Sequence, residues 1–314
     1  MSPIPLVELN NGTKIPIIGT GGGPSAMTVE ACEAVKKWML TAIQAGYRHI
    51  DTALLYGTEK VIGEAIRESG IPREEFFITT KLPFNCQDRV AESFDLSLKN
   101  LVSDALAHDR PLSRHARIPS FDSSLIASLP EGWLNLPRGP DGSVIAVDSP
   151  TFNESYAEIE KIYASGRAKA IGVSNFSIKT LEELLQTAKV VPAVNQIEFR
   201  ALSSRITRAR ELPRKRILPG ATKNAIREEP VIKEIAAKHG VSSTQVILAW
   251  HIAGGVIIVP KSENEQRQKD NLALPALDKE DMKKIDGLDR GERLCNTVDQ
   301  NGKFWGWTTE RLGW

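Results

Sequence analysis

The chain has 314 residues, and its 40 basic and 39 acidic side chains leave a formal net charge of +1. This near balance excludes a strong overall attraction to nucleic acid or to anionic membranes. The three cysteines, Cys32, Cys86 and Cys295, are too widely spaced for a disulfide framework or a metal knuckle. No stretch has the apolar length of a membrane span or the pattern of a signal peptide, so we expect a cytoplasmic protein without a metal.

The first third of the chain predicts a β-hairpin followed by alternating helices and strands. Asn11-Gly12 lies between two short apolar runs, which is the strongest local signal for a hairpin turn. The spacing of apolar residues then predicts helices over residues 28–45, 59–69 and 87–101. Short extended runs predict strands over residues 47–53 and 75–82.

The same alternation resumes after residue 150. Capping-box spacing at Thr151 and Glu154, and again at Ser242 and Gln245, marks two helix starts. Further helices are predicted over 177–188, 230–238 and 279–289 and around Asn271, and strands over 168–176, 191–199 and 254–262. Strand and helix alternate without a long linker, which predicts one domain over residues 1–314 with a parallel sheet and crossover helices. Six strand-helix units are visible, and a barrel of eight needs two more.

Polar residues follow the ends of successive predicted strands: Asp51, Tyr56, Lys81, Ser174, Asn175, Gln196, Lys261 and Ser262. The carboxyl ends of parallel strands meet at one face of a barrel, where catalytic residues gather. Taken alone, Asp51 as a turn cap and Lys81 as a solvated strand end are open alternatives. Their occurrence together at one rim favours a functional site.

A phenol, an ammonium and a carboxylate suit the reduction of a carbonyl. A free tyrosine, with a pKa of about 10, holds its proton at neutral pH and gives it up reluctantly. A nearby ammonium favours the phenolate and therefore eases proton release to a developing alkoxide. Lys81 is positioned to supply that charge to Tyr56, and Asp51 to hold Lys81 in place.

These residues lie in motifs that resemble the aldo-keto reductase family. "GYRHIDTALLYGTEKVIGEAI" resembles the family's signature around its Asp and Tyr, and "ITTKL" resembles the strand that carries its Lys. "AIGVSNF" and "VNQIE" are similar to its nicotinamide-contacting strands, and "VIIVPKSENEQRQKDN" to its adenine-side loop. The resemblance implies a (β/α)8 barrel and reduction of an aldehyde, ketone or sugar, with NADPH bound without a Rossmann fingerprint.

The resemblance also implies a role for each matching residue. Tyr56 is the expected proton donor, with Asp51 and Lys81 as its tuning pair. The expected cofactor contacts are Ser174, Asn175 and Gln196 at the nicotinamide, Lys261, Ser262 and Arg267 at the 2′-phosphate, and Asn271 at the adenine. Without the family match, "VPKSENEQRQKDN" also suits a solvated helix start. The expected partner is a small carbonyl compound, and the expected state is a monomer that binds neither nucleic acid nor membrane.

The first departure from the family pattern spans about residues 102–130. The family has a strand there that ends in a catalytic histidine followed by Trp and Pro. His108 and His115 occur in this segment, but neither ends an apolar run or precedes Trp-Pro. We therefore assign no catalytic histidine and expect the fourth strand of the barrel to be missing or improvised.

The second departure spans about residues 200–224. Between Ala201 and Lys223 there are seven basic residues and one Glu, a local charge of +6, without the apolar run of a buried strand. A nucleic-acid patch is an alternative, but the segment has no aromatic residue. We expect the seventh strand to be incomplete here, and both departures suggest a shifted reading frame, a retained intron or mis-splicing.

Two further features bear on activity. "GTGGG" replaces a family Gly-Thr-Trp and predicts a wider site with a looser loop, and Trp305, Trp307 and Trp314 suit either a pocket wall or packing on the rim. The alternative to an active reductase is a catalytically impaired homologue or mis-spliced product that at most binds nucleotide.

Overall fold

The structure is a computed structural model. It describes residues 3–26, 28–102, 140, 146, 149–197, 226–289, 298–304 and 306–314, and the backbone alone of 113–117, 216–219 and 224–225.

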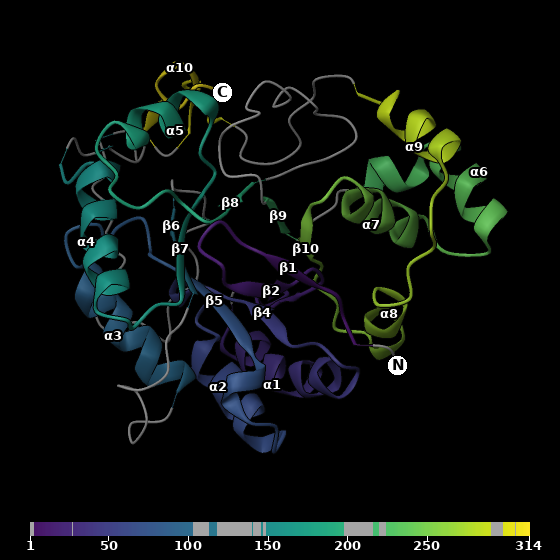
Figure 1. Cartoon of the computed structure of the whole chain (residues 1–314), viewed down its shortest axis with the longest axis horizontal. Coiled ribbons are helices and arrows are strands. Elements are labelled where there is room, and N and C mark those ends of the chain that lie inside the picture. Colours follow the sequence, from purple (N-terminus) through teal and green to yellow (C-terminus); the bar gives the residue numbers. More distant parts are fainter. Residues whose placement is uncertain are drawn as a thin grey trace.

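A ring of parallel strands forms the centre of the fold (Figure 1). The eight described strands of this sheet are, in spatial and chain order, β3 (Thr20–Gly21), β4 (His49–Asp51), β5 (Phe77–Lys81), β6 (Ser113–Arg117), β7 (Ala170–Ser174), β8 (Asn195–Gln196), β9 (Arg216–Pro219) and β10 (Ile257–Val259). The sheet closes on itself, because the backbone amides of Gly19 and Gly21 donate to the carbonyls of Ile258 and Pro260 at 2.7 and 3.1 Å. The fold is therefore the expected α/β barrel.

Helices surround the strands on the outside (Figure 1). They are α1 (Val29–Gln44), α2 (Glu59–Glu68), α3 (Val90–Leu101), α4 (Phe152–Ala164), α5 (Ile178–Leu185), α6 (Pro230–His239), α7 (Ser243–Ala253), α8 (Glu265–Asp270) and α9 (Lys279–Asp286). Short 3-10 turns occur at η1 (Leu54–Tyr56), η2 (Arg73–Glu75) and η4 (Asn224–Glu228). The predicted helices are confirmed to within a few residues at each end.

Local sequence signals account for many of these boundaries. Both predicted capping boxes are present, with Thr151 and Ser242 each accepting from the backbone three residues ahead. The hairpin at Asn11-Gly12 is confirmed as β1 (Leu6–Glu8) paired antiparallel with β2 (Lys14–Pro16). Each of these signals acts within a few residues, so the sequence predicts it well.

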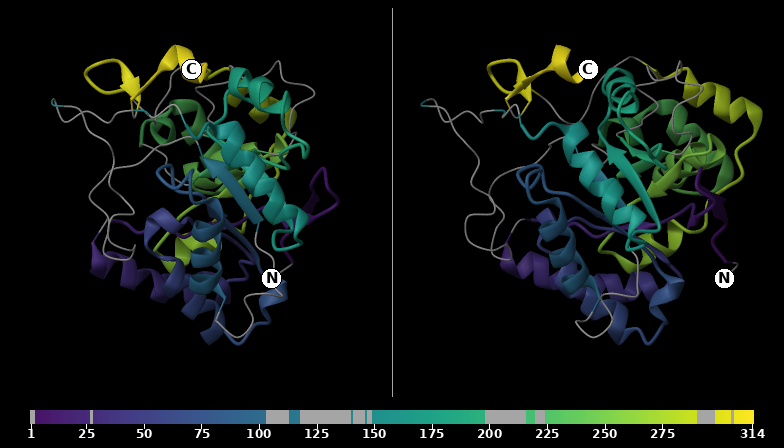
Figure 2. Two further views of the ribbon diagram at one scale, coloured as in Figure 1. Left: turned by 90° about the vertical axis from the view of Figure 1, so that its left-hand side faces the viewer. Right: turned by 60° about the vertical axis from the view of Figure 1, so that its left-hand side comes forward.

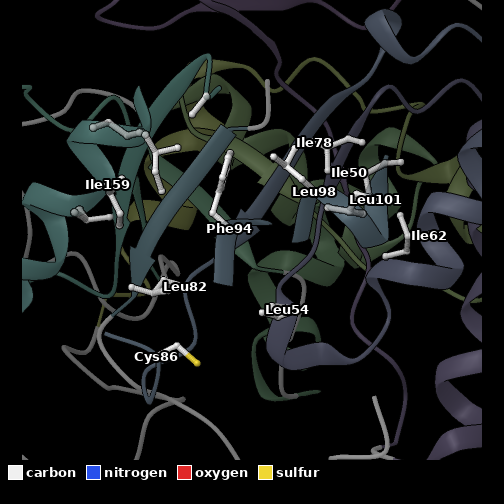
Figure 3. Packing of buried hydrophobic residues seen from close by; sticks show 14 of the residues in the cluster. Ile50, Leu54, Ile62, Ile78, Leu82, Cys86, Phe94, Leu98, Leu101 and Ile159 are labelled. Carbon is white, nitrogen blue, oxygen red and sulfur yellow. The ribbon is translucent and has the colours of Figure 1, made fainter. Parts of the chain in front are cut away.

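The largest hydrophobic cluster fills the space between strands β4 and β5 and helices α2, α3 and α4 (Figure 3). Its members include Ile50, Ile62, Ile78, Phe94 and Ile159, each with 1% of its surface exposed or less. Helix α2 approaches α3 closely at Gly63, where an added Cβ would lie 2.4 Å from the Asn100 carbonyl oxygen. This packing holds the ends of β4 and β5, and with them Asp51 and Lys81, in a fixed relation.

The fourth and seventh barrel positions are occupied by backbone from the two departing segments. Residues 113–117 pair with β5 and β7, and residues 216–219 pair with β8 and β10. The sequence predicted no regular strand at either place. The side chains of both strands lie outside the described residues, so incomplete packing of the barrel stays a prediction.

The C-terminal segment forms β11 (Lys303–Phe304), β12 (Trp307–Thr308) and α10 (Thr309–Leu312). Figure 2 shows it beside α5, and Phe304 and Leu312 join the largest core cluster. Trp307 and Trp314 are partly buried and pack against the same cluster, as the packing alternative expected for them, while Trp305 lies outside the described residues. No helix within the described ranges is long and apolar enough to cross a membrane.

Candidate active site

Asp51 and Lys81 form an ion pair inside the barrel. The Lys81 ammonium donates to Asp51 Oδ1 at 2.7 Å and Oδ2 at 2.8 Å, and to the Thr52 carbonyl at 2.8 Å. Only 5% of the Asp51 side chain and 2% of the Lys81 side chain are exposed. Their strands are neighbours, with Asp51 opposite Thr79 in the β4–β5 register. The predicted pairing is confirmed in the geometry, and the turn-cap and solvated-end alternatives do not describe these two residues.

Tyr56 lies beside this pair at the end of the turn η1. The Lys81 Nζ is 5.2 Å from the centre of the Tyr56 ring, within the distance at which an ammonium and an aromatic ring attract each other. Tyr56 is half-buried, and Gly57 ends the turn in the left-handed conformation at φ 68°. The phenol is thus held next to a buried cation while part of its surface faces outward.

The glycine run "GTGGG" packs tightly around the same strand end. An added Cβ at Gly22 would lie 2.6 Å from Ile62 Cδ1, and one at Gly23 would lie 3.6 Å from the Tyr56 ring. The Gly22 carbonyl accepts from the buried Thr58 hydroxyl at 2.8 Å, and its amide donates to the backbone carbonyl of Asp51 at 2.7 Å. A side chain at position 22 would therefore displace the tip of Ile62, whereas at position 23 an added Cβ would lie in ordinary van der Waals contact with the Tyr56 ring.

Ser174, Asn175 and Gln196 come together at the ends of β7 and β8. The backbone carbonyl of Gln196 accepts from the Ser174 hydroxyl at 3.0 Å and from the backbone amide of Asn175 at 2.9 Å. Asn175 has φ 63°, a left-handed conformation that Asn tolerates better than most residues. The Gln196 side chain reaches across and donates to Asp51 Oδ2 at 3.1 Å. Hydrogen bonds therefore connect these three residues to the Asp51–Lys81 pair.

Lys261, Ser262, Arg267 and Asn271 lie on the segment from the end of β10 through α8. Lys261 is 5.8 Å from the Trp38 ring centre and forms a 2.9 Å ion pair with Glu263. Burial raises the pKa of Tyr47 well above its usual value, and its side-chain hydrogen bond with Asn271 partly offsets that effect. Two cations, a hydroxyl and an amide on one segment are a donor set that fits a phosphate and a purine.

Two buried polar residues near these groups were not identified from the sequence as functional. His49 lies below Asp51 on β4, where its ring nitrogens contact the Pro16 carbonyl at 3.3 Å and the Thr79 hydroxyl at 3.4 Å. Gln268 joins α8 to α1 through its amide. The partners of both come from distant parts of the chain, so local patterns carry no signal for them.

The histidines give no catalytic partner among the described side chains near Tyr56. His115 is opposite Lys81 in the β5–β6 register, but its side chain lies outside the described residues, and so does all of His108. Where the chain is described, no group of three or more His, Cys, Asp or Glu residues could hold a metal ion.

Comparison with known sequences identifies relatives over nearly the whole chain. The model of the "Aldo/keto reductase family" matches residues 17–227 and 209–290. "Glycerol 2-dehydrogenase (NADP(+))" of Saccharomyces cerevisiae is 36% identical over 300 residues, covering 92% of each chain. "Glyoxal reductase" of Bacillus subtilis is 35% identical over 306 residues, covering 94% of this chain and 96% of its own.

Solved structures agree with the sequence matches. An aldo-keto reductase from Bombyx mori, in complex with NADP, superposes with a TM-score of 0.77 at 26% identity, over 98% of this chain and 99% of that one. The aldose reductase from Schistosoma japonicum gives a TM-score of 0.79 at 26% identity, over 99% of both chains. The barrel, the buried acid–lysine pair beside a tyrosine and these matches together place the chain in the aldo-keto reductase family.

Proposed function

We propose that this protein reduces the carbonyl of an aldehyde, ketone or sugar to the alcohol with NADPH, and that Tyr56 donates the proton. The observation that carries the proposal is the buried Asp51–Lys81 ion pair, whose ammonium lies 5.2 Å from the Tyr56 ring centre. A buried cation beside a phenol favours release of the phenolic proton, so it suits general acid catalysis by a tyrosine at neutral pH.

The chemistry divides between cofactor and protein. NADPH, when bound, supplies the hydride that the carbonyl carbon accepts. Tyr56 gives its phenolic proton to the carbonyl oxygen, and the Lys81 ammonium stabilises the phenolate that remains. Asp51 holds that ammonium through both carboxylate oxygens, and the Thr52 carbonyl fixes its third direction. The pair therefore arrives at the reaction already oriented, with little reorganisation to make.

The cofactor contacts follow from the positions of the polar side chains. Ser174, Asn175 and Gln196 lie at the strand ends next to Asp51 and suit the nicotinamide carboxamide, because they supply both donors and acceptors. Lys261, Ser262 and Arg267 suit the 2′-phosphate, and Asn271 suits the adenine. NADPH is favoured over NADH because the charges of Lys261 and Arg267 attract the 2′-phosphate, which NADH lacks.

The named activities of the relatives support a small carbonyl compound as substrate. One is a glycerol 2-dehydrogenase and another a glyoxal reductase. Gly23 lies beside the Tyr56 ring and has no side chain, so the site accepts a wider range of substituents next to the carbonyl than a bulky residue at that position would allow.

The test replaces the phenol and keeps its ring. Tyr56→Phe is expected to lower kcat for a generic aromatic aldehyde by a factor of about 10² to 10⁴, while NADPH still quenches tryptophan fluorescence with its original Kd. Tyr163→Phe is the matched control, since Tyr163 lies on α4 and its hydroxyl accepts from Asn11 Nδ2 of the N-terminal hairpin at 3.3 Å. Full turnover in Tyr56→Phe would reject Tyr56 as the acid.

The unmodified chain itself separates the two candidate functions. Turnover with NADPH supports the active reductase. Binding of NADPH without turnover of any carbonyl tested would favour the impaired homologue, in which the departing segments around residues 102–130 and 200–224 disable the site.

The proposal includes a monomer in the cytoplasm that binds no nucleic acid. The net charge of +1 supports the last point, because it provides no general attraction to phosphate backbones. Light scattering on the purified protein tests whether it is a monomer. Salt-sensitive DNA or RNA binding that depends on the arginines between residues 205 and 216 would contradict the expected absence of nucleic-acid binding.

A further inference from the structure

We propose that Gln268 is a positioning residue that holds the phosphate-binding segment Lys261–Ser262 against helix α1, and so sets the affinity for the phosphorylated end of the cofactor. This inference rests on the proposed function, because it takes NADPH as the ligand of that segment. Gln268 itself is buried, with 1% of its surface exposed, so it acts through its neighbours and not by contact with the cofactor.

The Gln268 amide is fully used in contacts between distant segments. Its Nε2 donates to the Trp38 carbonyl on α1 at 2.9 Å and to the Ser262 carbonyl at 2.8 Å. The Thr41 hydroxyl, also on α1, lies 2.7 Å from Oε1. One side chain thus joins α1, α8 and the segment that follows β10.

Chemistry fixes the direction of these bonds. Two carbonyl oxygens face the same atom, and only an NH2 group can donate to both. Thr41 has one hydroxyl proton and lies close to both the Trp38 carbonyl, at 2.8 Å, and Gln268 Oε1. The Trp38 carbonyl already accepts from the Gln268 side-chain amide, so we assign the Thr41 hydroxyl proton to Gln268 Oε1. Both N–H groups and the oxygen of the Gln268 side chain then have a hydrogen-bond partner.

Helix α8 is joined to α1 and to the Ser262 carbonyl through Gln268. It has six residues, and Gln268 is the one that is buried. A helix this short is not stable alone in water, and α8 presents no apolar face for packing. The Tyr47 hydroxyl adds a further tie by donating to the Gln268 carbonyl at 3.0 Å.

The consequence for the cofactor segment is direct. The carbonyl that Gln268 holds belongs to Ser262, one of the residues proposed to meet the 2′-phosphate. Its neighbour Lys261 lies over Trp38, the residue whose carbonyl accepts from the same amide. Loss of the amide frees the Ser262 backbone to move away from α1. The segment must then become ordered when the phosphate binds, and this entropy cost lowers the affinity for the phosphate.

The experiment compares two glutamines on the same helix. Gln268→Met keeps the length of the side chain and removes its hydrogen bonds, whereas Gln266→Met changes an exposed glutamine that donates to Asp270 Oδ1 at 2.8 Å. Kd values for NADPH, NADH and 2′,5′-ADP are measured by calorimetry. We expect Gln268→Met to weaken NADPH and 2′,5′-ADP by about tenfold and NADH by less than about threefold, and Gln266→Met to change none of them.

A second pair of variants keeps the test decisive if Gln268→Met does not fold. Thr41→Val removes the donor to Oε1, and Thr41→Ser retains it. We expect Thr41→Val to weaken NADPH binding about threefold and Thr41→Ser to restore it. An unchanged NADPH Kd in folded Gln268→Met, an equal loss for NADPH and NADH, or equal Kd values for the two Thr41 variants would overturn the inference. No NADPH binding by the unmodified chain would instead reject the proposed function.

Discussion

The buried ion pair between Asp51 and Lys81 requires each partner to compensate the other. Both side chains are at least 95% buried, and each finds its opposite charge within 2.8 Å. Removing water from a charge is expensive, and the attraction inside the barrel offsets this cost only while the pair is intact. Gln196 and Thr52 supply the remaining hydrogen bonds, so the whole group behaves as one unit.

Asp51→Asn is therefore expected to lower the stability of the fold as well as the rate of the reaction. It leaves an uncompensated ammonium in the barrel, and the expected loss is about 3–5 kcal/mol of unfolding free energy. The double variant Asp51→Asn/Lys81→Met removes both charges and should regain most of that loss in urea denaturation.

The exposed pair Glu158–Lys161 is the control for this prediction. Its side chains are 48% and 72% exposed, so Glu158→Gln should change the unfolding free energy by less than about 1 kcal/mol. A double variant at the barrel site that is no more stable than Asp51→Asn would contradict the compensation argued for the buried pair.

We expect His49 to make the stability of the fold sensitive to acid. Burial lowers the pKa of His49 to about 4, although the neighbouring Asp51 charge acts in the opposite direction and Lys81 adds to the lowering. The Pro16 carbonyl and the Thr79 hydroxyl face its two ring nitrogens, which suits a neutral ring with one donor and one acceptor. In the unfolded chain a histidine titrates at about 6.5.

The sign of the pH effect follows from these two values. Between pH 6.5 and 4 the unfolded chain binds a proton at His49 that the folded chain does not, so stability falls as the pH drops through this window. His49→Gln keeps one donor and one acceptor without a titrating group. We expect the difference in unfolding free energy between pH 7.5 and 4.5 to shrink by a few kcal/mol in that variant. Parallel pH curves for the two proteins, measured by urea denaturation, would show that His49 does not cause the loss.

At the scale of elements, the C-terminal segment braces the loop that carries Ser174 and Asn175. Arg311 on α10 makes a two-pronged ion pair with Glu183 on α5, at 2.7 and 3.0 Å. Gly313, at φ 69°, approaches Ser177 so closely that an added Cβ would lie 2.5 Å from the Ser177 hydroxyl. Ser177 caps α5 just after Asn175, so the tail supports the backbone from which the proposed nicotinamide contacts extend.

Arg311→Ala is expected to loosen this contact. The Arg311–Glu183 ion pair is half-exposed and two-pronged, and the rings of Phe152 and Trp307 lie near the Arg311 guanidinium. We expect its loss to lower the free energy of local opening by about 1–2 kcal/mol, which corresponds to a five- to thirtyfold larger open population. Hydrogen exchange of residues 175–178 and proteolysis of the tail measure it. Lys303→Ala, an exposed change in the same segment, is the control, and equal exchange in both variants would rule out the brace.

The sequence predicted the elements whose signals are local. The capping boxes at Thr151 and Ser242 and the turn at Asn11-Gly12 depend on residues a few positions apart, and all are present. The convergence of Asp51 and Lys81 was also predictable, because parallel neighbouring strands end on the same face. Strands β3 and β8 have two residues each, which is too short for a periodic pattern. The sequence predicted β8 because it lies within a longer apolar run, and it did not predict β3.

The contacts that the sequence did not predict are those between distant segments. Gln268 lies in a stretch identified for its charged residues, and its partner Thr41 is 227 positions away. The bond from Gln196 to Asp51 spans 145 positions. A glutamine looks alike in sequence whether it is buried or exposed, as Gln266 and Gln268 on one short helix demonstrate.

At the scale of the whole molecule, the barrel closes through two strands of unusual sequence. The fourth strand reads Ser-Arg-His-Ala-Arg, and the seventh begins with an arginine and ends in a proline. Barrel interiors are normally filled by layers of bulky branched side chains, and proline cannot donate to a neighbouring strand. Backbone pairing at these positions thus coexists with two arginines and a histidine in the fourth strand, and with an arginine and a proline in the seventh.

The cofactor-free protein is consequently expected to be of low stability. Its thermal unfolding should be broad and begin below about 45 °C, the lower end for ordinary domains, and a dye that binds exposed apolar surface should fluoresce before the main transition. NADPH at about 100 times its Kd adds about 2.7 kcal/mol to the folded state, which should raise the midpoint by roughly 5 °C. Calorimetry with and without NADPH measures both effects. A sharp, cooperative transition at high temperature without NADPH would mean that the fourth and seventh strands complete the core, because only a continuous packed interior unfolds as one unit.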